Sequence, residues 1–318
     1  MTYDTVVLSG GEIKGFALLG ALDYLQSHMY LTNVTNWYGT SIGAILGYLM
    51  AIGYTPREVL SWMCSREGHF SDVVFSIRGA LEGDGATGFG FIQTILENMT
   101  LAKRHRFYTL GSLKRETGFR LCAVTYNKTD CKTVCLTPET YPDLQCIIAL
   151  RMSANFPNLF PRFEYLGKSW VDGAVTNNFP IDLAMADPYV NNMVAITVTQ
   201  PPTPIETYTG RDPYNASLIP SIIRESYMYL CAVHHELDSY KIQQIPAGST
   251  VIRVPMSSPG LNAVNMTNQD RVSMFEEGYF SLRREYEPDS SDPEEIEDLS
   301  IDEVTTAENS GDMQTPAE

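Results

Sequence analysis

The first 55 residues repeat one pattern twice: a short apolar run, a glycine turn and an apolar helix. Residues 6–8 form the first run, and apolar side chains then recur at helical spacing over residues 14–25. A second short strand at residues 37–38 is followed by a glycine turn and by an apolar helix over residues 42–52. Strands that alternate with helices through short turns predict an α/β fold.

The same patterns extend over most of the chain and stop abruptly near its end. They predict strands at residues 119–126, 133–136, 193–199 and 250–254, and helices at residues 91–99, 144–152, 216–242 (capped by Ser217) and 270–286. After Tyr286 the chain becomes acidic and loses its aromatic residues. We therefore expect one folded domain over residues 1–286 and a disordered acidic tail over residues 287–318.

The charge distribution and the cysteines exclude several classes of protein. Residues 285–318 hold 13 of the 38 acidic residues and none of the 22 basic ones, so the rest of the chain is nearly neutral. A nearly neutral body lacks the basic face of a nucleic-acid-binding protein. The sequence contains no apolar run long enough to span a bilayer and no basic leader, and its six cysteines are scattered. These features predict a cytoplasmic protein.

The second glycine turn has the spacing of a nucleophile elbow. Gly39, Ser41 and Gly43 form a G-x-S-x-G motif between the strand at residues 37–38 and the apolar helix that follows. In such an elbow a sharp strand-to-helix turn exposes the serine hydroxyl, and small residues allow strand and helix to approach closely. The alternative is that Ser41 only caps the helix.

The first glycine turn has a composition suited to binding an anion. Gly10, Gly11 and Gly15 lie between the first strand and the first helix, where successive backbone N–H groups can form a nest. An acyl-transfer enzyme uses such donors to bind its oxyanion. A phosphate-binding P-loop does not fit, because Phe16 stands where that motif needs a lysine. A simple tight turn is the remaining alternative.

A serine nucleophile needs a base, and the best candidate is an aspartate. Asp172 follows a short strand (residues 169–171) and is followed by the small residues Gly173 and Ala174. A Ser-Asp-His triad would need a late histidine, but His234 and His235 lie within a predicted helix, where we expect a structural or surface role. The pattern favours a Ser41–Asp172 dyad, although such a turn is also typical of an ordinary surface connection.

These segments, in this order, resemble the patatin-like phospholipases, which are serine lipid acyl hydrolases with a Ser-Asp dyad. The resemblance covers roughly residues 5–286 and rests on the glycine-rich loop, the elbow, the Asp-Gly-Ala turn and the segments before and after that turn (residues 8–15, 39–43, 172–174, 152–161 and 177–180). It implies a three-layer α/β/α fold with a mostly parallel central sheet.

The resemblance also implies roles for individual residues. Ser41 would be the nucleophile, Asp172 the base, and the backbone amides around Gly10, Gly11 and Glu12 the oxyanion hole, without a metal or cofactor. Lys14 would either steady the loop or contact a lipid phosphate. The family usually has a third glycine where this chain has Glu12. The Glu12 N–H is retained, but its carboxylate would oppose a developing oxyanion unless it turns to solvent or pairs with Lys14.

The function implied by the resemblance is hydrolysis of fatty-acyl esters, of the phospholipase A type. The substrate would be a phospholipid or another acyl lipid at a membrane surface, with which the protein associates peripherally. Two alternatives remain open at this point. One is a non-catalytic lipid-binding or interaction protein on the same fold, and the other is a lipid transacylase, which would use the same acyl-enzyme with a different acceptor.

Overall fold

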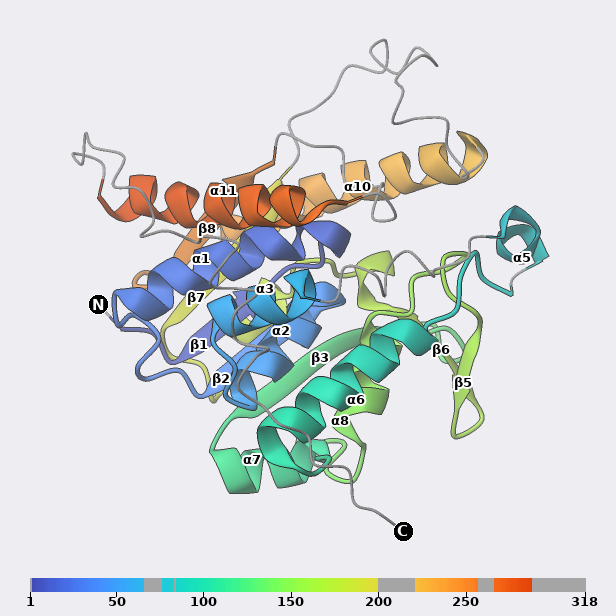
Figure 1. Ribbon diagram of the computed structural model, residues 1–318, viewed down its shortest axis with the longest axis horizontal. Coiled ribbons are helices and arrows are strands. Elements are labelled where there is room, and N and C mark those ends of the chain that lie inside the picture. Colours follow the sequence, from blue (N-terminus) through green and yellow to red (C-terminus); the bar gives the residue numbers. More distant parts are fainter. Residues whose placement is uncertain (1, 66–75, 83, 200–220, 257–265, 288–318) are drawn as a thin grey trace.

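The computed structural model describes residues 2–65, 76–82, 84–199, 221–256 and 266–287 (Figure 1). These residues form an eight-stranded sheet with helices on both faces. The strands are β1 (Thr5–Leu8), β2 (Asn36–Thr40), β3 (Arg120–Asn127), β4 (Lys132–Leu136), β5 (Phe163–Tyr165), β6 (Lys168–Asp172), β7 (Met193–Thr199) and β8 (Thr250–Pro255). The helices are α1 (Gly15–Ser27), α2 (Ile42–Ala51), α3 (Pro56–Cys64), α5 (Ile77–Glu82), α6 (Gly90–Arg104), α7 (Leu110–Thr117), α8 (Cys146–Ser153), α9 (Ile181–Met185), α10 (Ser221–Ile242) and α11 (Asn268–Tyr286).

The sheet is parallel at its centre and antiparallel at one side. Its order by hydrogen-bonded neighbours is β5-β6-β3-β2-β1-β7-β8. Strands β2 and β6 pair with successive parts of one side of β3, and β4 pairs with its other side. The neighbours from β3 through β2, β1 and β7 to β8 are parallel, whereas β4 and β6 run antiparallel to β3 and β5 runs antiparallel to β6. The predicted α/β/α fold with a mostly parallel central sheet is therefore confirmed.

Alternation along the central strands divides the core between the two faces of the sheet. Val6 and Leu8 point to one face and Val7 points to the other, because successive side chains of a strand face opposite ways. The first face carries the larger core, which includes α1, α2, α3, α6, α7, α8 and α11. The second face is covered by α9 and by Ile242 at the end of α10. Both faces of the parallel strands are buried, as expected for crossover helices.

Helices α1 and α11 lie side by side, with their backbones in direct contact (Figure 1). A Cβ atom on Gly20 of α1 would lie 1.7 Å from the carbonyl oxygen of Phe275, and one on Gly278 of α11 would lie 1.9 Å from that of Ala17. No side chain fits at either position. These two glycines therefore allow the C-terminal helix to dock on the N-terminal one.

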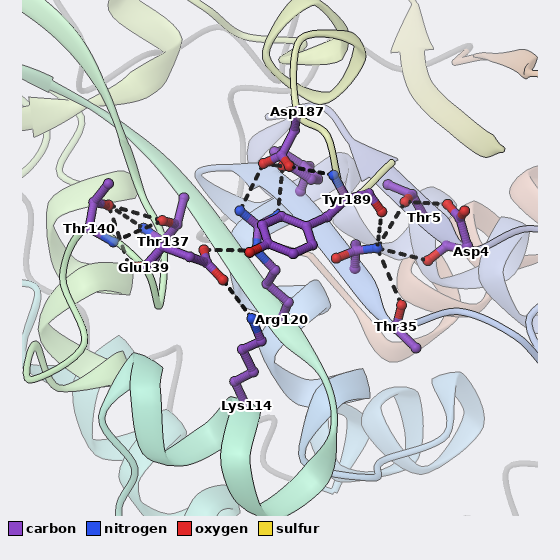
Figure 2. A network of polar contacts seen from close by, with 12 residues as sticks. Asp4, Thr5, Thr35, Lys114, Arg120, Thr137, Glu139, Thr140, Asp187 and Tyr189 are labelled. Carbon is purple, nitrogen blue, oxygen red and sulfur yellow. Dashed lines mark hydrogen bonds and ion pairs between the residues drawn. The ribbon is translucent and has the colours of Figure 1, made fainter. Parts of the chain in front are cut away.

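A buried arginine and its carboxylate partners lie at the amino ends of β2 and β3. Figure 2 shows Arg120, the first residue of β3, between two carboxylates: its Nε lies 2.9 Å from Glu139 Oε2, and its Nη2 lies 2.8 Å from Asp187 Oδ2. Lys114 of α7 donates to the second oxygen of Glu139 at 2.7 Å. Because the network fills this end, the loops that can form a site lie at the opposite, carboxyl ends of the parallel strands.

The predicted strands and helices are present wherever the structure describes them. The short elements β5, α5, α7 and α9 are not predicted. Of the predicted helix over residues 216–242, the part from Ser221 on is described as α10; its predicted cap at Ser217 and the tail residues 288–318 lie outside the described residues. None of the helices in the described ranges is both long and apolar enough to cross a bilayer.

Candidate active site

Ser41 occupies a strained turn between β2 and α2. Its φ of 55° and ψ of −122° lie outside the regions that non-glycine residues normally adopt. Backbone strain of this kind costs about 1–3 kcal/mol and is concentrated at functional sites. A Cβ on Gly39 would lie 2.3 Å from Ala44 N, and one on Gly43 would lie 2.6 Å from the carbonyl oxygens of Leu8 and Ser9. Both elbow glycines are therefore required for the close approach of strand and helix.

A second serine, which the sequence does not single out for a role, supports the elbow from α8. Ser153 Oγ accepts a hydrogen bond from the Ser41 N–H at 3.0 Å and donates to the Val124 carbonyl of β3 at 2.6 Å. Ser153 is fully buried. The Ser41 amide is therefore fixed to the neighbouring strand. In the sequence, the only signal for Ser153 is its position within residues 152–161, one of the segments on which the resemblance to the patatin-like phospholipases rests.

The last residues of strands β2 and β6 lie next to each other along one side of β3. Thr40, the last residue of β2, pairs with Val124, and Asp172, the last residue of β6, pairs with the next residue, Thr125. Because β4 pairs with both Val124 and Thr125, it fills the other side of β3, so β2 and β6 must share the remaining side. The strand ends that carry Ser41 and Asp172 therefore adjoin along β3 and approach this place from opposite directions.

Asp172 is held rigidly at this point. Its side chain is buried, with only 1% of the residue exposed. The Asp172 N–H donates to the Asn155 carbonyl at 3.0 Å, and Asp172 Oδ1 accepts from the Ala174 N–H at 2.8 Å. A Cβ on Gly173 would lie 2.4 Å from the Val124 carbonyl oxygen, so the turn lies directly on β3. The small residues Gly173 and Ala174 thus allow the carboxylate to be both buried and oriented.

The glycine-rich loop lies over the elbow. A Cβ on Gly10 would lie 3.5 Å from Ser41 Cβ, and one on Gly15 would lie 2.4 Å from the Ile42 side chain. The Gly10 N–H donates to the Asn178 carbonyl at 2.9 Å. Within the described residues, the N–H groups of Gly11 and Ile42 donate to no protein acceptor. The Gly10 N–H is thus used within the protein, whereas those of Gly11 and Ile42 are left for another acceptor within the part of the chain that the structure describes.

The glycine-rich loop contains two charged residues, Lys14 and Glu12. Lys14 is only 6% exposed, which favours its structural role in the loop over contact with a lipid phosphate. The Glu12 backbone forms part of the short 3-10 turn Glu12–Lys14, but the Glu12 side chain lies outside the described part of the structure. Whether its carboxylate turns away from the elbow therefore stays a prediction.

Asn177 and Asn178, five and six residues after Asp172, join the three segments. Thr40 Oγ1 donates to the Asn177 carbonyl at 2.9 Å, next to Ser41. The Asn177 N–H donates to the Gly173 carbonyl at 2.8 Å, and Asn178 accepts from Gly10. The elbow, the glycine-rich loop and the Asp172 turn are therefore held by one dipeptide.

Titratable side chains of α10 lie over the Asp172 turn. Burial, together with the nearby Lys241 cation, lowers the pKa of His234, and the adjacent Val175 backbone opposes this shift. Burial raises the pKa of Asp238 to about 7, Lys241 opposes this rise and the Asp182 carboxylate adds to it. Near neutral pH, His234 is therefore mostly neutral and Asp238 only partly ionised. His234 has the structural environment expected of it from the sequence.

No cluster of three or more His, Cys, Asp or Glu side chains suited to a metal ion occurs in the described residues. The chemical groups that the site offers are therefore a hydroxyl, a buried carboxylate and backbone amides. A hydroxyl on a strained turn, a carboxylate at the same point and amides beside them form the combination that acyl transfer requires.

Two viral proteins show sequence similarity to this chain. One is a protein named "Probable lipid hydrolase 463L" from Invertebrate iridescent virus 6, 33% identical over 186 residues, which cover 58% of this chain and 63% of the relative. The other is "Uncharacterized protein R571" from Acanthamoeba polyphaga mimivirus, 27% identical over 182 residues, which cover 56% and 60%. The match thus spans less than two thirds of the length of either relative.

A solved structure of similar fold and a family model also match this chain. The crystal structure of VipD from Legionella pneumophila superposes with a TM-score of 0.50 over 89% of this chain and 66% of that protein, at 15% identity, which is a likeness of fold alone. The model of the family described as patatin-like phospholipase matches residues 6–185, a region that holds the glycine-rich loop, the elbow and the Asp172 turn. Since this match covers more than half of the chain, the protein belongs to the patatin-like phospholipase family.

Proposed function

We propose that this protein is a lipid acyl hydrolase of the phospholipase A type, with Ser41 as its nucleophile and Asp172 as its base. The observation that carries the proposal is the meeting of β2 and β6 on one side of β3, with a strained serine at one strand end and a buried carboxylate at the other. The family membership and the relative named as a lipid hydrolase support a lipid ester as the substrate.

The chemistry follows the ordinary course of a serine acyl hydrolase. Asp172 accepts the Ser41 proton as Oγ attacks the ester carbonyl, and the amides of Gly11 and Ile42 bind the resulting oxyanion. Collapse of this intermediate expels the lipid alcohol, which takes up the proton from Asp172, and leaves an acyl group on Ser41. Asp172 then activates a water molecule, which releases the fatty acid and restores Ser41. No step requires a metal or an organic cofactor.

We also propose how the chain divides into domains and where in the cell the protein works. We take residues 1–286 as the catalytic domain and residues 287–318 as a separate acidic tail, and we expect the protein to work in the cytoplasm. The domain boundary agrees with the end of α11 at Tyr286.

The proposal is tested by fatty-acid release from mixed phospholipid vesicles. The wild-type protein should release fatty acid, and Ser41→Ala should lower the rate by roughly 10³-fold or more, because Ser41 carries the acyl group in the proposed mechanism. Ser65→Ala, which alters an exposed serine at the end of α3, is the matched control and should keep the wild-type rate. Equal background release by wild type and Ser41→Ala would contradict the proposal and favour a non-catalytic lipid-binding protein.

The proposed contact with a lipid surface is supported by the exposed side of α10. Four large hydrophobic residues of this helix are between 43% and 69% exposed: Tyr229, Val233, Leu237 and Tyr240. Their spacing of three to four residues puts them on one side of the helix over roughly 17 Å. Tyrosines suit the boundary between lipid headgroups and chains, and the other side of α10 lies over the Asp172 turn.

A charge within this stripe should weaken binding to lipid. For Val233→Glu we expect about tenfold weaker cosedimentation with neutral phosphatidylcholine vesicles, since burial of one aliphatic side chain contributes about 1.5 kcal/mol or more. Hydrolysis of a monomeric soluble ester should stay within about twofold of wild type. Leu101→Glu, at an exposed leucine of α6, is the matched control and should bind vesicles normally. Unchanged vesicle binding by Val233→Glu would exclude this stripe as the lipid contact.

A further inference from the structure

Lys241, near the end of α10, contacts the segment that follows the Asp172 turn. Its Nζ lies 2.6 Å from Asn177 Oδ1, 3.2 Å from the Phe179 carbonyl oxygen and 3.1 Å from Asp182 Oδ1. The Lys241 side chain is only 15% exposed. All three of these acceptors come from residues 177–182. Lys241 thus joins a distant helix to one short stretch of chain.

Asn177 uses each of its polar groups in this region. Its side-chain amide donates to both oxygens of Asp182, at 3.0 and 3.3 Å, and Oδ1 accepts from Lys241. Its backbone N–H donates to the Gly173 carbonyl at 2.8 Å, and its carbonyl accepts from Thr40 Oγ1 at 2.9 Å. Asn177 is only 6% exposed. A shift of this residue would therefore move both the turn after Asp172 and the residue before Ser41.

The next residue extends this link to the glycine-rich loop. Asn178 accepts from the Gly10 N–H at 2.9 Å, and a Cβ on Gly10 would lie 2.5 Å from Asn178 Oδ1. This contact leaves no room for a side chain between the Gly10 backbone and the Asn178 side chain. The position of Gly10 over Ser41 therefore depends on where the Asn177–Asn178 segment lies.

Removal of the Lys241 ammonium group would leave one buried acceptor, Asn177 Oδ1, without its donor, and a buried polar atom that loses its partner is costly. The Phe179 carbonyl also loses Lys241 but keeps the Ile181 N–H as a donor at 3.0 Å. The surrounding chain would then shift to reach water or another donor. Since the same segment holds Thr40 and Gly10, such a shift would reach the elbow and the amides beside it.

From these contacts we propose that Lys241 is a positioning residue, which acts through Asn177 to hold Ser41, Asp172 and the glycine-rich loop in register. The proposal rests on the function proposed above and adds a component from outside the matched family region, which ends at residue 185. Lys241 does not touch the substrate in this scheme. Its effect is to keep three separate segments in the geometry that the reaction needs, where a displacement of about 1 Å can cost 10²-fold in rate.

The test is Lys241→Met, which keeps the length of the side chain and removes the donor. With a soluble ester, we expect kcat to fall at least about tenfold while KM stays within about twofold. Two controls remove ion pairs without breaking the link. Asp182→Asn removes the charged partner of Lys241, keeps one oxygen that can accept from the Asn177 amide, and leaves the hydrogen bond from Lys241 to Asn177. Lys114→Met removes the ion pair to Glu139 at the other end of the sheet. Both should keep kcat within about threefold.

Hydrogen exchange gives a second readout that does not depend on activity. In Lys241→Met, the amides of Gly10 and Asn177 should exchange at least about tenfold faster than in wild type, and in the two controls they should not. If the wild type hydrolyses no ester, the proposed function fails, and exchange alone then decides the positioning role.

The proposal is overturned if Lys241→Met keeps both the wild-type kcat and the wild-type exchange of Gly10. It is also overturned if Lys241→Met and Asp182→Asn behave alike, since Lys241 would then contribute only an ion pair. Should Lys241→Met not fold, Asn177→Ala tests the same link from its other end. That variant removes the acceptor of Lys241 but keeps the carbonyl that binds Thr40, and an unchanged kcat in Asn177→Ala would contradict the proposal.

Discussion

Replacement of Asp172 by Asn should lower kcat for ester hydrolysis by roughly 10³-fold without unfolding the protein. The amide has the shape of the carboxylate, and its oxygen can still accept the hydrogen bond that the Ala174 N–H donates to Asp172 Oδ1. An amide cannot, however, accept the Ser41 proton at neutral pH. We therefore expect kcat to fall and KM to change little, because Asp172 is buried beneath the proposed substrate site.

This expectation is checked by steady-state kinetics with a soluble ester and by the rate at which a fluorophosphonate labels Ser41. Both rates should fall in Asp172→Asn, because both need an activated hydroxyl. Asp143→Asn, at an exposed aspartate, is the matched control and should behave as wild type. Thermal unfolding must show that Asp172→Asn is folded. Wild-type kinetics in a folded Asp172→Asn protein would mean that another group acts as the base.

Gly278→Ala should lower the free energy of unfolding by about 3 kcal/mol or more, the largest stability effect that we expect. The added methyl group would lie 1.9 Å from the Ala17 carbonyl oxygen, which belongs to the backbone of α1 and cannot rotate away. Helices α1 and α11 would have to separate, and this would expose part of the core around Phe275. In a helix interior alanine is favoured over glycine by only about 1 kcal/mol, so overpacking dominates.

Urea or thermal unfolding measures this effect, with a fall in Tm of roughly 2–4 °C for each kcal/mol in a chain of this size. Gly90→Ala, at the start of α6, is the matched control, since a Cβ there would meet no atom within 4 Å. It should leave the free energy of unfolding unchanged or raise it by up to about 1 kcal/mol. Equal stability of Gly278→Ala and wild type would show that α11 does not dock on α1 in this way.

The sequence alone predicted the elements that depend on local pattern. The apolar runs before Gly10 and Gly39 predicted β1 and β2, and helical spacing predicted α1 and α2. The elbow motif predicted a turn, and the structure shows its strain in the positive φ of Ser41. These features could be read from the sequence because each is decided by residues within a few positions of one another, through side-chain periodicity, turn chemistry and the small size of glycine.

Only the tertiary structure determined how distant parts of the chain meet. That β2 and β6 end on the same side of β3 depends on the order and register of strands more than 100 residues apart, which no local pattern encodes. The links from Ser153 to the elbow and from Lys241 to Asn177 depend likewise on the packing of helices far apart in the chain. The sequence thus determined the candidate residues, Ser41 and Asp172, while the sheet register decided that the strand ends carrying them adjoin. The physical reason is that periodicity sets which face of an element is buried, whereas the partner of that face is chosen by packing over the whole domain.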